Sequence, residues 1–391
     1  MRLAILSRSR RCYSTRRLVE AAEARGHRVK VFDPLRMAIF VSTHRPELAY
    51  GGKPIARYDA VIPRIGASVT FYGLAVLRQF EQMGVCVINE SQGIARSRDK
   101  LRAHQILSRH EIGIPPTAFA RQPEDIVPAI EKVGGVPVIV KVLEGTQGVG
   151  VILAESLKTA EAVIETLHGA RQNILIQRFI SESRGTDIRA FVVGDRVIAA
   201  MRRVAKSGEF RSNVHKGASV EPVALEPRYR RAAILAARIF NLSVAGVDLL
   251  ESSSGPMVME VNSSPGLEGI EAATGVDVAG EIVKLVESRV RFGEGETRLE
   301  EMLRLREGYA VASLPLAHLP QYHRKRLKDV DFTEREIRVL AIRRGELTIP
   351  VPSGKTRLYP GDLLVCYGNV AMMEALLPAA GSAAEGGTPA F

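Results

Sequence analysis

The stretch VMEVNSSPG, residues 258–266, places a carboxylate and an amide two residues apart in an otherwise apolar run. Alternate side chains of a β-strand point to the same face, so Glu260 and Asn262 would share one face and Val261 would lie on the other. Burying a carboxylate is costly unless a positive charge lies beside it. The stretch therefore predicts either a solvated strand face or a site where a cation lies between these side chains.

A third oxygen-bearing residue lies in a neighbouring strand-like run. Asp248 belongs to VAGVDLLE (244–251), and the turn ESSSGP (251–256) separates this run from the first. The two strands could pair antiparallel and bring Asp248 beside Glu260. An isolated acidic pair is more often a solvated face. Three oxygen groups on two paired apolar strands favour a site for magnesium or manganese, and the absence of His and Cys argues against zinc.

A glycine-rich segment, EGTQGVGV (144–151), follows the predicted strand VIVKV (138–142). Glycines let backbone N–H groups approach phosphate oxygens closely, although no GK[ST] follows, so this is not a Walker A loop. Lys141 interrupts the apolar strand and could place its charge on the same phosphates. Taken alone, the glycine-rich segment slightly favours a flexible hairpin connection, and a lysine that reaches solvent explains Lys141 equally well.

The composition of the 391-residue chain is that of a globular protein, with 46% hydrophobic and 25% charged residues. No run is long enough for a signal peptide or a membrane span, so no membrane association is expected. Three widely spaced cysteines without CxxC spacing predict a cytoplasmic protein without a disulfide framework. The net charge of +11 would attract polyanions, but no nucleic-acid motif appears, and direct nucleic-acid binding is not expected.

The pattern of strands and helices predicts an α/β and α+β multidomain protein, since the length exceeds that of one compact core. The first domain is expected to be an open α/β domain, and the second a mixture of β-branched strands and helices. A charged helical linker, a small β-rich α+β domain and a disordered tail follow. The expected boundaries are 1–95, 96–289, 290–306, 307–379 and 380–391.

The glycine-rich loop, the lysine and the oxygen ligands together describe a site for ATP with bridging magnesium. The sequence resembles ATP-grasp carboxylate–amine ligases, and specifically the RimK family, which adds glutamate to the C-terminus of a small-subunit ribosomal protein. The resemblance implies an ATP-grasp fold preceded by an open α/β domain, and it extends over residues 1–288. The matching segments are PRIGASVTFYG (63–73), SRDKLRA (97–103), LEGTQGVGV (143–151), TDIRAFVVG (186–194), FRSNVHKGA (210–218), VAGVDLL (244–250) and VMEVNSSPGLEGIE (258–271).

The resemblance implies a role for each matched residue. The residues that would contact the ATP phosphates are Lys100 and Lys141, the latter also near the adenine pocket. The adenine hinge would be Gln177, Arg178 and Phe179, where the family usually carries glutamate in place of Arg178. Asp187 would hold the ribose. The residues that would line the nucleotide and acyl-phosphate region are Arg211, Ser212 and Asn213, with Arg211 and Asn213 catalytic. The ligands of two magnesium or manganese ions would be Asp248, Glu260 and Asn262.

The implied reaction is the ATP-dependent addition of L-glutamate to the C-terminal carboxylate of a ribosomal small-subunit protein through an acyl phosphate. The segment GELTIPVPSGKTRLYPGDLLVCYG (345–368) resembles the C-terminal ligand-binding module of TrkA-type potassium-transport regulators and implies a regulatory domain. The family resemblance also implies a homo-oligomer, with a tetramer expected. Two alternatives remain open: the same chemistry on a small-molecule or other peptide acceptor, and a nucleotide-sensing regulator without catalysis.

Overall fold

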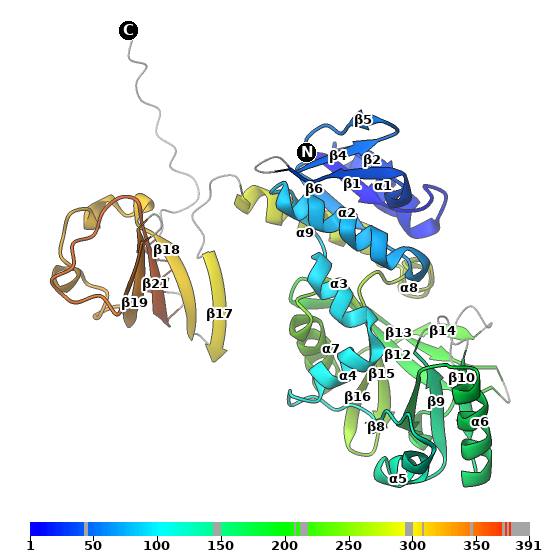
Figure 1. The fold of residues 1–391 in the computed structure, drawn as a ribbon. Helices are drawn as coiled ribbons and strands as arrows, with labels where there is room; N and C mark the ends of the chain where they lie inside the picture. Colours follow the sequence, from blue (N-terminus) through cyan, green and yellow to red (C-terminus); the bar gives the residue numbers. More distant parts are fainter. Residues whose placement is uncertain are drawn as a thin grey trace. The chain divides into compact units, whose positions relative to one another are not determined.

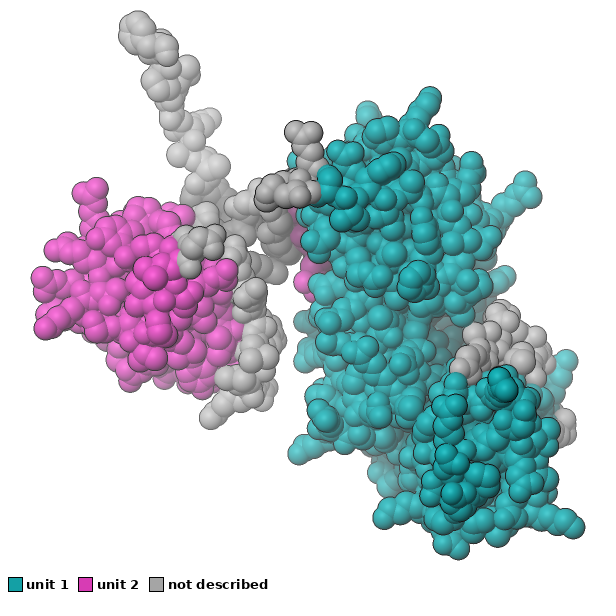
Figure 2. Space-filling model, viewed as in Figure 1, with its two compact units in different colours: residues 1–287 teal, residues 288–391 magenta. Residues whose placement is uncertain are grey.

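The computed structural model describes most of the chain in two compact units, Met1–Glu287 and Ser288–Phe391 (Figures 1 and 2). The described residues are 1–42, 46–143, 150–206, 209–211, 218–293, 300–306, 309–344, 347–369, 372–373 and 375–376, with the side chains of 291–293, 300–306 and His318 left aside. Within these residues, no helix combines the length and the apolar character that crossing a membrane requires.

A parallel four-stranded sheet of order β2-β1-β6-β7 opens the first unit. Its strands are β1 (Arg2–Leu6), β2 (Arg28–Phe32), β6 (Ala60–Pro63) and β7 (Cys86–Val87). Helix α1 (Tyr13–Ala24) follows β1, and α2 (Thr70–Gln82) follows β6, which is the open α/β alternation that the sequence predicts. A small antiparallel sheet escaped prediction and consists of β3 (Met37–Phe40), β4 (Glu47–Tyr50) and β5 (Lys53–Pro54).

Two short helices lead from this domain into the next, α3 (Ser91–Arg98) and α4 (Lys100–Leu107). The side chain of Asp99 accepts a hydrogen bond from the backbone N–H of Arg102 at 2.9 Å, and this N-cap starts α4 at Lys100. The cap places Lys100 in the first turn of a helix whose opposite end is buried at Leu107.

The next sheet is antiparallel, of order β10-β9-β11-β8. Its strands are β8 (Thr117–Ala118), β9 (Val138–Val142), β10 (Val151–Ala154) and β11 (Ile174–Arg178). Helices α5 (Ile126–Lys132) and α6 (Leu157–Gly169) contribute Ile126, Ile130 and Ile164 to the core that Val138, Val140 and Ile176 form on the sheet. The alternation of β9 therefore turns Lys141 away from this core.

A five-stranded antiparallel sheet of order β14-β13-β12-β15-β16 completes the first unit. Its strands are β12 (Thr186–Val193), β13 (Arg196–Val204), β14 (Ser219–Pro222), β15 (Val244–Ser252) and β16 (Gly255–Asn262). Helix α7 (Pro227–Ile239) packs Ala233 and Ala236 into one core with Ile188 and Ala190 of β12 and Val247 of β15. The residues between these on the strands, among them Asp187, Arg189 and Asp248, consequently lie on the opposite face. Helices α8 (Glu268–Thr274) and α9 (Val278–Gly293) follow β16.

The second unit contains an antiparallel sheet of order β17-β18-β21-β19-β20. Its strands are β17 (Glu300–Arg306), β18 (Tyr309–Pro315), β19 (Ile337–Arg344), β20 (Leu347–Pro350) and β21 (Asp362–Asn369). The predicted linker helix over 290–306 is wrong for 300–306, because this segment pairs with β18 and its LRLR alternation suits a strand. The expected disordered tail, 380–391, lies outside the described residues.

Candidate functional site

The two oxygen-bearing runs pair as the sequence predicts. Strands β15 and β16 are antiparallel, Asp248 lies directly opposite Glu260, and Asn262 lies opposite Gly246. The register shifts between Asp248 and Leu249, leaving one extra residue on β16 beside the pair. Asn262 Nδ2 lies 3.5 Å from Asp248 Oδ2. The predicted convergence of Asp248, Glu260 and Asn262 is therefore present in the fold.

Asp248 is buried and is held by two arginines of the same sheet face. Arg189 donates to both of its carboxylate oxygens at 2.7 Å, and Arg203 Nη2 lies 3.0 Å from Oδ2. Burial alone would raise the pKa of Asp248, but the two guanidinium groups outweigh this effect and lower it. Asp248 is therefore an ionised group with fixed orientation.

Glu260 differs from Asp248 because it is exposed to solvent, and its carboxylate has no hydrogen bond or ion pair to the described side chains. The protein atoms around it and the negative charge of Asp248 raise its pKa, while Arg189 and Lys141 offset only part of this effect. A divalent cation would supply the missing compensation.

The donor chemistry fits a hard cation such as magnesium. No group of three or more His, Cys, Asp and Glu side chains is placed to hold a metal ion within the described ranges. The set offered here is instead two carboxylates and the amide of Asn262, all of which can bind through oxygen. Magnesium usually keeps waters and substrate phosphates as further ligands, so a partial protein set is sufficient.

A second group of residues comes from the neighbouring β8–β11 sheet and α4. Lys141 Nζ donates to Gln177 Oε1 at 2.6 Å, and Gln177 Nε2 donates to Thr117 Oγ1 at 2.8 Å and to His104 Nε2 at 3.0 Å. His104 Nδ1 in turn donates to the backbone oxygen of Lys100 at 2.8 Å. This arrangement orients Lys141 through the side chain of a buried glutamine.

Lys141 lies within electrostatic reach of the carboxylate pair. Burial lowers the pKa of Lys141 to about 8, the charge of Lys100 acts in the same direction, and Glu260 and Asp248 act in the opposite one. The ammonium group of Lys100 donates to the backbone oxygens of Val142 at 3.2 Å and Leu143 at 3.1 Å. The sequence-predicted lysines and carboxylates therefore belong to one electrostatic site.

His104 and Arg203 are not among the site residues that the sequence predicts. Burial lowers the pKa of His104, and the charge of Lys141 lowers it further, so a neutral ring accepts from Gln177. The position of His104, four residues after Lys100 on a helix, was a usable signal for contact with the lysine segment. Arg203 lies in the strand-like basic segment AAMRRVA (199–205), but nothing in that segment distinguishes it from a surface arginine, because its partners lie on neighbouring strands.

Several residues that are predicted to contact the nucleotide already form hydrogen bonds within the protein. Both oxygens of Asp187 accept from Arg203, at 2.6 and 2.5 Å. Arg178 is exposed, and its backbone N–H donates to Pro116 at 2.9 Å. The backbone N–H of Phe179 donates to Pro137 at 3.3 Å. Holding ribose or adenine would therefore require Asp187 to share its oxygens with Arg203, and the hinge to use other backbone atoms.

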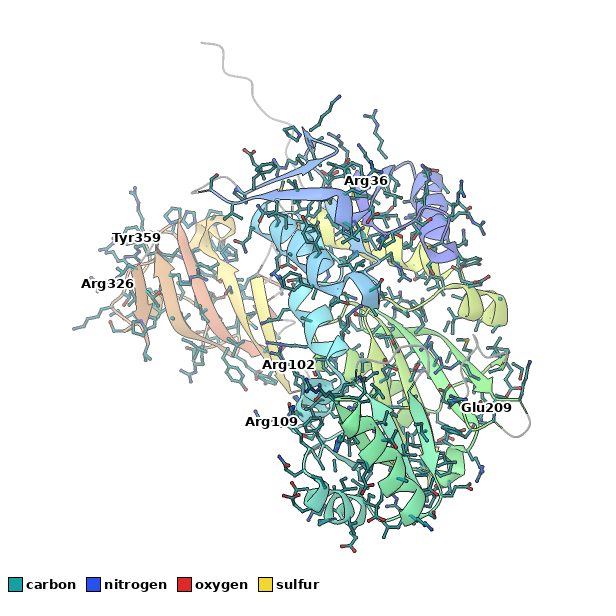
Figure 3. All side chains as sticks on the ribbon, turned by 45° about the vertical axis from the view of Figure 1, so that its right-hand side comes forward. Arg36, Arg102, Arg109, Glu209, Arg326 and Tyr359 are labelled. Carbon is teal, nitrogen blue, oxygen red and sulfur yellow. The ribbon has the colours of Figure 1, made fainter. Side chains whose placement is uncertain are left out.

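Two predicted segments are described only at their edges. Ser212 and Asn213 lie outside the described residues, as do Gly145 and Gly148. Arg211 is described, and its guanidinium pairs with Glu209 at 2.7 Å (Glu209 is labelled in Figure 3). Gly150 has a φ of +73°, and a Cβ there would lie 2.9 Å from Val142 Cβ, so this end of the loop requires glycine.

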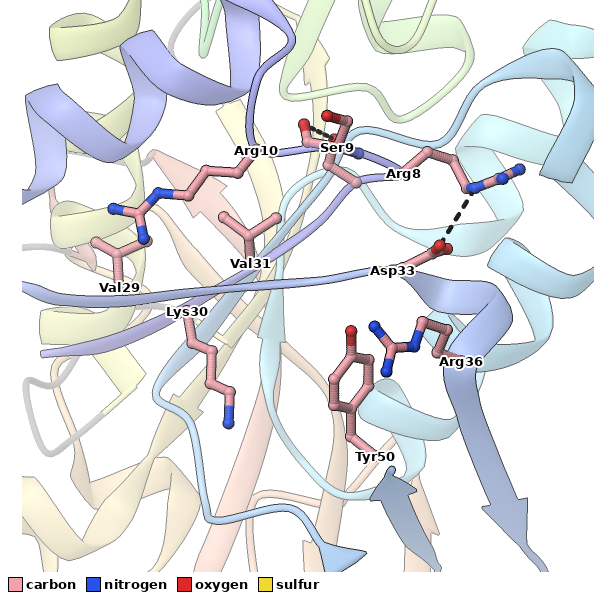
Figure 4. Close-up of a pocket in the computed structure, with 10 residues that line it drawn as sticks. Arg8, Ser9, Arg10, Val29, Lys30, Val31, Asp33, Arg36 and Tyr50 are labelled. Atoms are coloured by element: carbon pink, nitrogen blue, oxygen red, sulfur yellow. Dashed lines mark hydrogen bonds and ion pairs between the residues drawn. The ribbon is translucent and has the colours of Figure 1, made fainter. Parts of the chain in front are cut away.

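A pocket of about 300 Å³ lies elsewhere in the first unit, beside the edge strand β2 (Figure 4). None of the predicted site residues lines it. The ten lining residues are Ser7, Arg8, Ser9, Arg10, Val29, Lys30, Val31, Asp33, Arg36 and Tyr50. Four of these are cations and one is an acid, and the ion pair of Arg8 with Asp33 at 3.3 Å offsets one of the four charges. The pocket is therefore a basic surface outside the candidate centre.

Family models account for most of the chain. A RimK PreATP-grasp domain matches residues 1–94, a RimK-like ATP-grasp domain matches 97–286, and a TrkA-C domain matches 311–381. A probable alpha-L-glutamate ligase of Rhodopirellula baltica is 55% identical over 378 residues, which cover 97% of this chain and 93% of that one. The chain belongs to the RimK family of ATP-grasp ligases.

Further relatives agree with this assignment. A probable alpha-L-glutamate ligase of Thioalkalivibrio sulfidiphilus is 58% identical over 298 residues, which cover 76% of this RimK-family chain and 99% of that one. The ATP-grasp ligase PsnB is 23% identical, with a TM-score of 0.60, and the match covers 74% of this chain and 98% of that one. A RimK domain protein from Sphaerobacter thermophilus is 24% identical, with a TM-score of 0.56 and coverage of 73% and 100%. The expected ATP-grasp fold is confirmed, and the chain is an ATP-dependent ligase.

Proposed function

We propose that this RimK-family ligase adds L-glutamate to the C-terminal carboxylate of a protein or peptide, with a ribosomal small-subunit protein as the acceptor. The amino acid is supported by relatives named alpha-L-glutamate ligases. A peptide acceptor is supported by the fold neighbours, since PsnB and the macrocyclase MdnC were each solved with a precursor peptide. The fold is also compatible with other peptide acceptors. The family membership argues against a sensor without catalysis.

The observation that carries this proposal is the carboxylate pair Asp248–Glu260 within electrostatic reach of Lys141. Asp248, Glu260 and Asn262 would hold two magnesium or manganese ions, and Lys100 and Lys141 would contact the phosphates of ATP. The fold neighbour PsnB was solved with magnesium and ADP. A bound metal would neutralise the negative charge that develops during phosphoryl transfer.

The reaction has two steps that conserve all atoms. The acceptor carboxylate attacks the γ-phosphorus of ATP, which breaks the bond to ADP and forms an acyl phosphate. The amine of L-glutamate then attacks the acyl carbon, forming the amide and releasing phosphate and a proton. Positioning of the reactants and electrostatic stabilisation by Lys141 and Arg211 would be the main contributions of this chain.

The proposal is tested by phosphate release with ATP, magnesium and a peptide carrying the C-terminal residues of a ribosomal small-subunit protein. Release is expected to require L-glutamate, and mass spectrometry is expected to show glutamate residues added to the peptide. Phosphate release that is indifferent to L-glutamate, with no change in peptide mass, would contradict the proposal.

The depressed pKa of Lys141 predicts a pH-dependent affinity for ATP. The protonated amine is the form that attracts phosphate, and with a pKa of about 8 this form declines between pH 7 and pH 9. The Kd for a non-hydrolysable ATP analogue should therefore rise by about tenfold over this interval, because a pKa of about 8 lowers the fraction of protonated lysine by about this factor. Isothermal titration calorimetry at both pH values measures the change.

Lys141→Arg is the matched control, because arginine stays charged at pH 9. Its Kd for the analogue should change much less over the same interval. An equal rise in the variant and the parent would show that another group causes the pH dependence.

We further propose that the second unit regulates the ligase and is not needed for catalysis. The match with the Thioalkalivibrio relative covers 99% of that protein but only 76% of this chain. A chain that ends at Gly293, after α9, should retain glutamate-dependent phosphate release. Complete loss of turnover in a truncated chain that keeps the melting temperature of the first unit would place the second unit in the catalytic apparatus.

The assembly is a proposal from the family resemblance, and the compartment is a proposal from the cysteine pattern. We propose a cytoplasmic homo-oligomer, and specifically a tetramer, which light scattering of the purified full chain would measure directly.

A further inference from the structure

Among the described residues, two arginines near the candidate centre have only neutral hydrogen-bond acceptors. Arg64, which follows β6, donates Nη2 to the backbone oxygen of Pro265 at 2.7 Å. Arg98, at the end of α3, donates Nη1 to Thr70 Oγ1 at 2.7 Å and Nη2 to the backbone oxygen of Ile65. Neither guanidinium forms an ion pair with a carboxylate of the described ranges.

The partial burial of these two cations without an anion among the described residues is unfavourable. Burial lowers the pKa of Arg64 to about 10, and the charge of Arg98 acts in the same direction. Burial also lowers the pKa of Arg98. Charged groups removed from water are normally paired, and a guanidinium offers five N–H donors. An anion bound between the two arginines would relieve this cost.

The same region contains polar atoms without partners. Arg98 Nε and the hydroxyl oxygens of Ser263 and Ser264 are buried, and none of the three has a hydrogen-bond partner among the described residues. The two serines immediately precede Pro265, whose backbone oxygen accepts from Arg64. Hydroxyl and guanidinium groups are all able to donate to a carboxylate. We call Arg64, Arg98, Ser263 and Ser264 the Arg64–Arg98 cluster.

The cluster adjoins the candidate metal centre through close packing. A Cβ on Gly246 would lie 2.7 Å from Pro265 Cβ, so Pro265 can pack here only against glycine. Gly246 is the partner of Asn262 in the β15–β16 register. The same Cβ would lie 3.7 Å from Cδ of Arg189, the residue that holds Asp248. A ligand at the cluster would therefore be next to the proposed metal and nucleotide.

We propose that the Arg64–Arg98 cluster binds the side-chain carboxylate of the incoming L-glutamate and selects an acidic amino acid. This inference rests on the proposed ligase function, in which the amine reacts and neither carboxylate of the incoming amino acid takes part. Arginine suits this task because its planar donors match a carboxylate. Glutamine has nearly the same shape but would leave a partly buried guanidinium without an anionic partner, so the cluster discriminates by charge.

The test compares Arg64→Gln with Arg102→Gln in the full chain. Arg102 is exposed on α4, only four residues from Arg98, and lies outside the cluster (labelled in Figure 3). Arg64→Gln should raise the KM for L-glutamate by about 10- to 100-fold, the effect of losing one hydrogen bond to a charged group. The KM for ATP should stay unchanged, and the preference for L-glutamate over L-glutamine should fall. Arg102→Gln should match the parent, and Arg64→Lys should recover part of the loss.

Direct calorimetry of L-glutamate binding, with a non-hydrolysable ATP analogue present, separates this inference from the proposed function. Weaker binding in Arg64→Gln than in the parent supports the cluster even if the parent forms no amide bond, an outcome that would contradict only the ligase proposal. Equal binding or an unchanged KM for L-glutamate overturns the cluster while leaving the ligase intact. An effect confined to the KM of the acceptor peptide also overturns it, because the carboxylate would then belong to the acceptor.

Discussion

Glu260→Ala is expected to lower glutamate-dependent phosphate release by about 10²- to 10³-fold, the effect of removing one electrostatic contact to a developing charge. Of the two carboxylates in the candidate metal set, that of Glu260 has the less positive charge beside it. The surrounding protein atoms and the charge of Asp248 raise its pKa. Removing it takes away a proposed metal ligand while leaving the β15–β16 pairing, which is made by backbone atoms. Steady-state phosphate release at saturating ATP and magnesium measures the effect.

The same variant should keep its free energy of unfolding. Glu260 is exposed, and its side chain has no ion pair with the described residues. Its removal therefore leaves no described cation without its ion-pair partner. Glu165→Ala, an exposed glutamate of α6, is the matched control and should change neither property. Near-parental turnover in Glu260→Ala would count against this residue as a metal ligand.

Asp248→Ala is expected to lose turnover. Its free energy of unfolding is expected to fall by about 3–5 kcal/mol, because one partner of a buried ion pair is removed. The side chain of Asp248 is 3% exposed, and those of Arg203 and Arg189 are 6% and 17% exposed. The substitution leaves Arg189 without its carboxylate partner and Arg203 with Asp187 alone. Urea denaturation followed by circular dichroism, with Glu165→Ala as the control, measures the change.

Asp248→Asn separates the charge of this residue from its hydrogen bonds. The amide can accept from only one oxygen, so its stability should lie between that of the parent and that of Asp248→Ala. Equal stability of Asp248→Ala and the parent would mean that the arginine pairs contribute nothing to the fold. The contrast between Glu260, with an effect on turnover alone, and Asp248, with effects on turnover and stability, is specific to this arrangement.

The convergence of Asp248, Glu260 and Asn262 was predictable because it depends on local geometry. The alternation of β16 and the short turn at 251–256 were enough to bring Glu260 and Asn262 beside Asp248. Lys141 was visible as a charge in an apolar strand. The open α/β domain followed from the same strand and helix periodicities, and the β3–β5 sheet was missed.

Long-range partners were not predictable from the sequence. Arg203 meets Asp187 and Asp248 only because β13, β12 and β15 are neighbours in the sheet, and no spacing along the chain shows this. Gln177 and Lys141 touch because β11 pairs with β9. The error at 300–306 had a different cause: its charged residues favoured a helix, while pairing with β18 makes the segment a strand.

The central claim is that Asp248, Glu260 and Asn262 hold the metal ions of an ATP site. A crystal of the full chain grown with manganese and a non-hydrolysable ATP analogue tests it directly, because manganese gives anomalous scattering. The account predicts anomalous peaks in contact with oxygens of Glu260 and Asn262, with the analogue phosphates between these peaks and Lys141. Nucleotide and manganese bound at another place, with Glu260 and Asn262 facing only solvent, would contradict it.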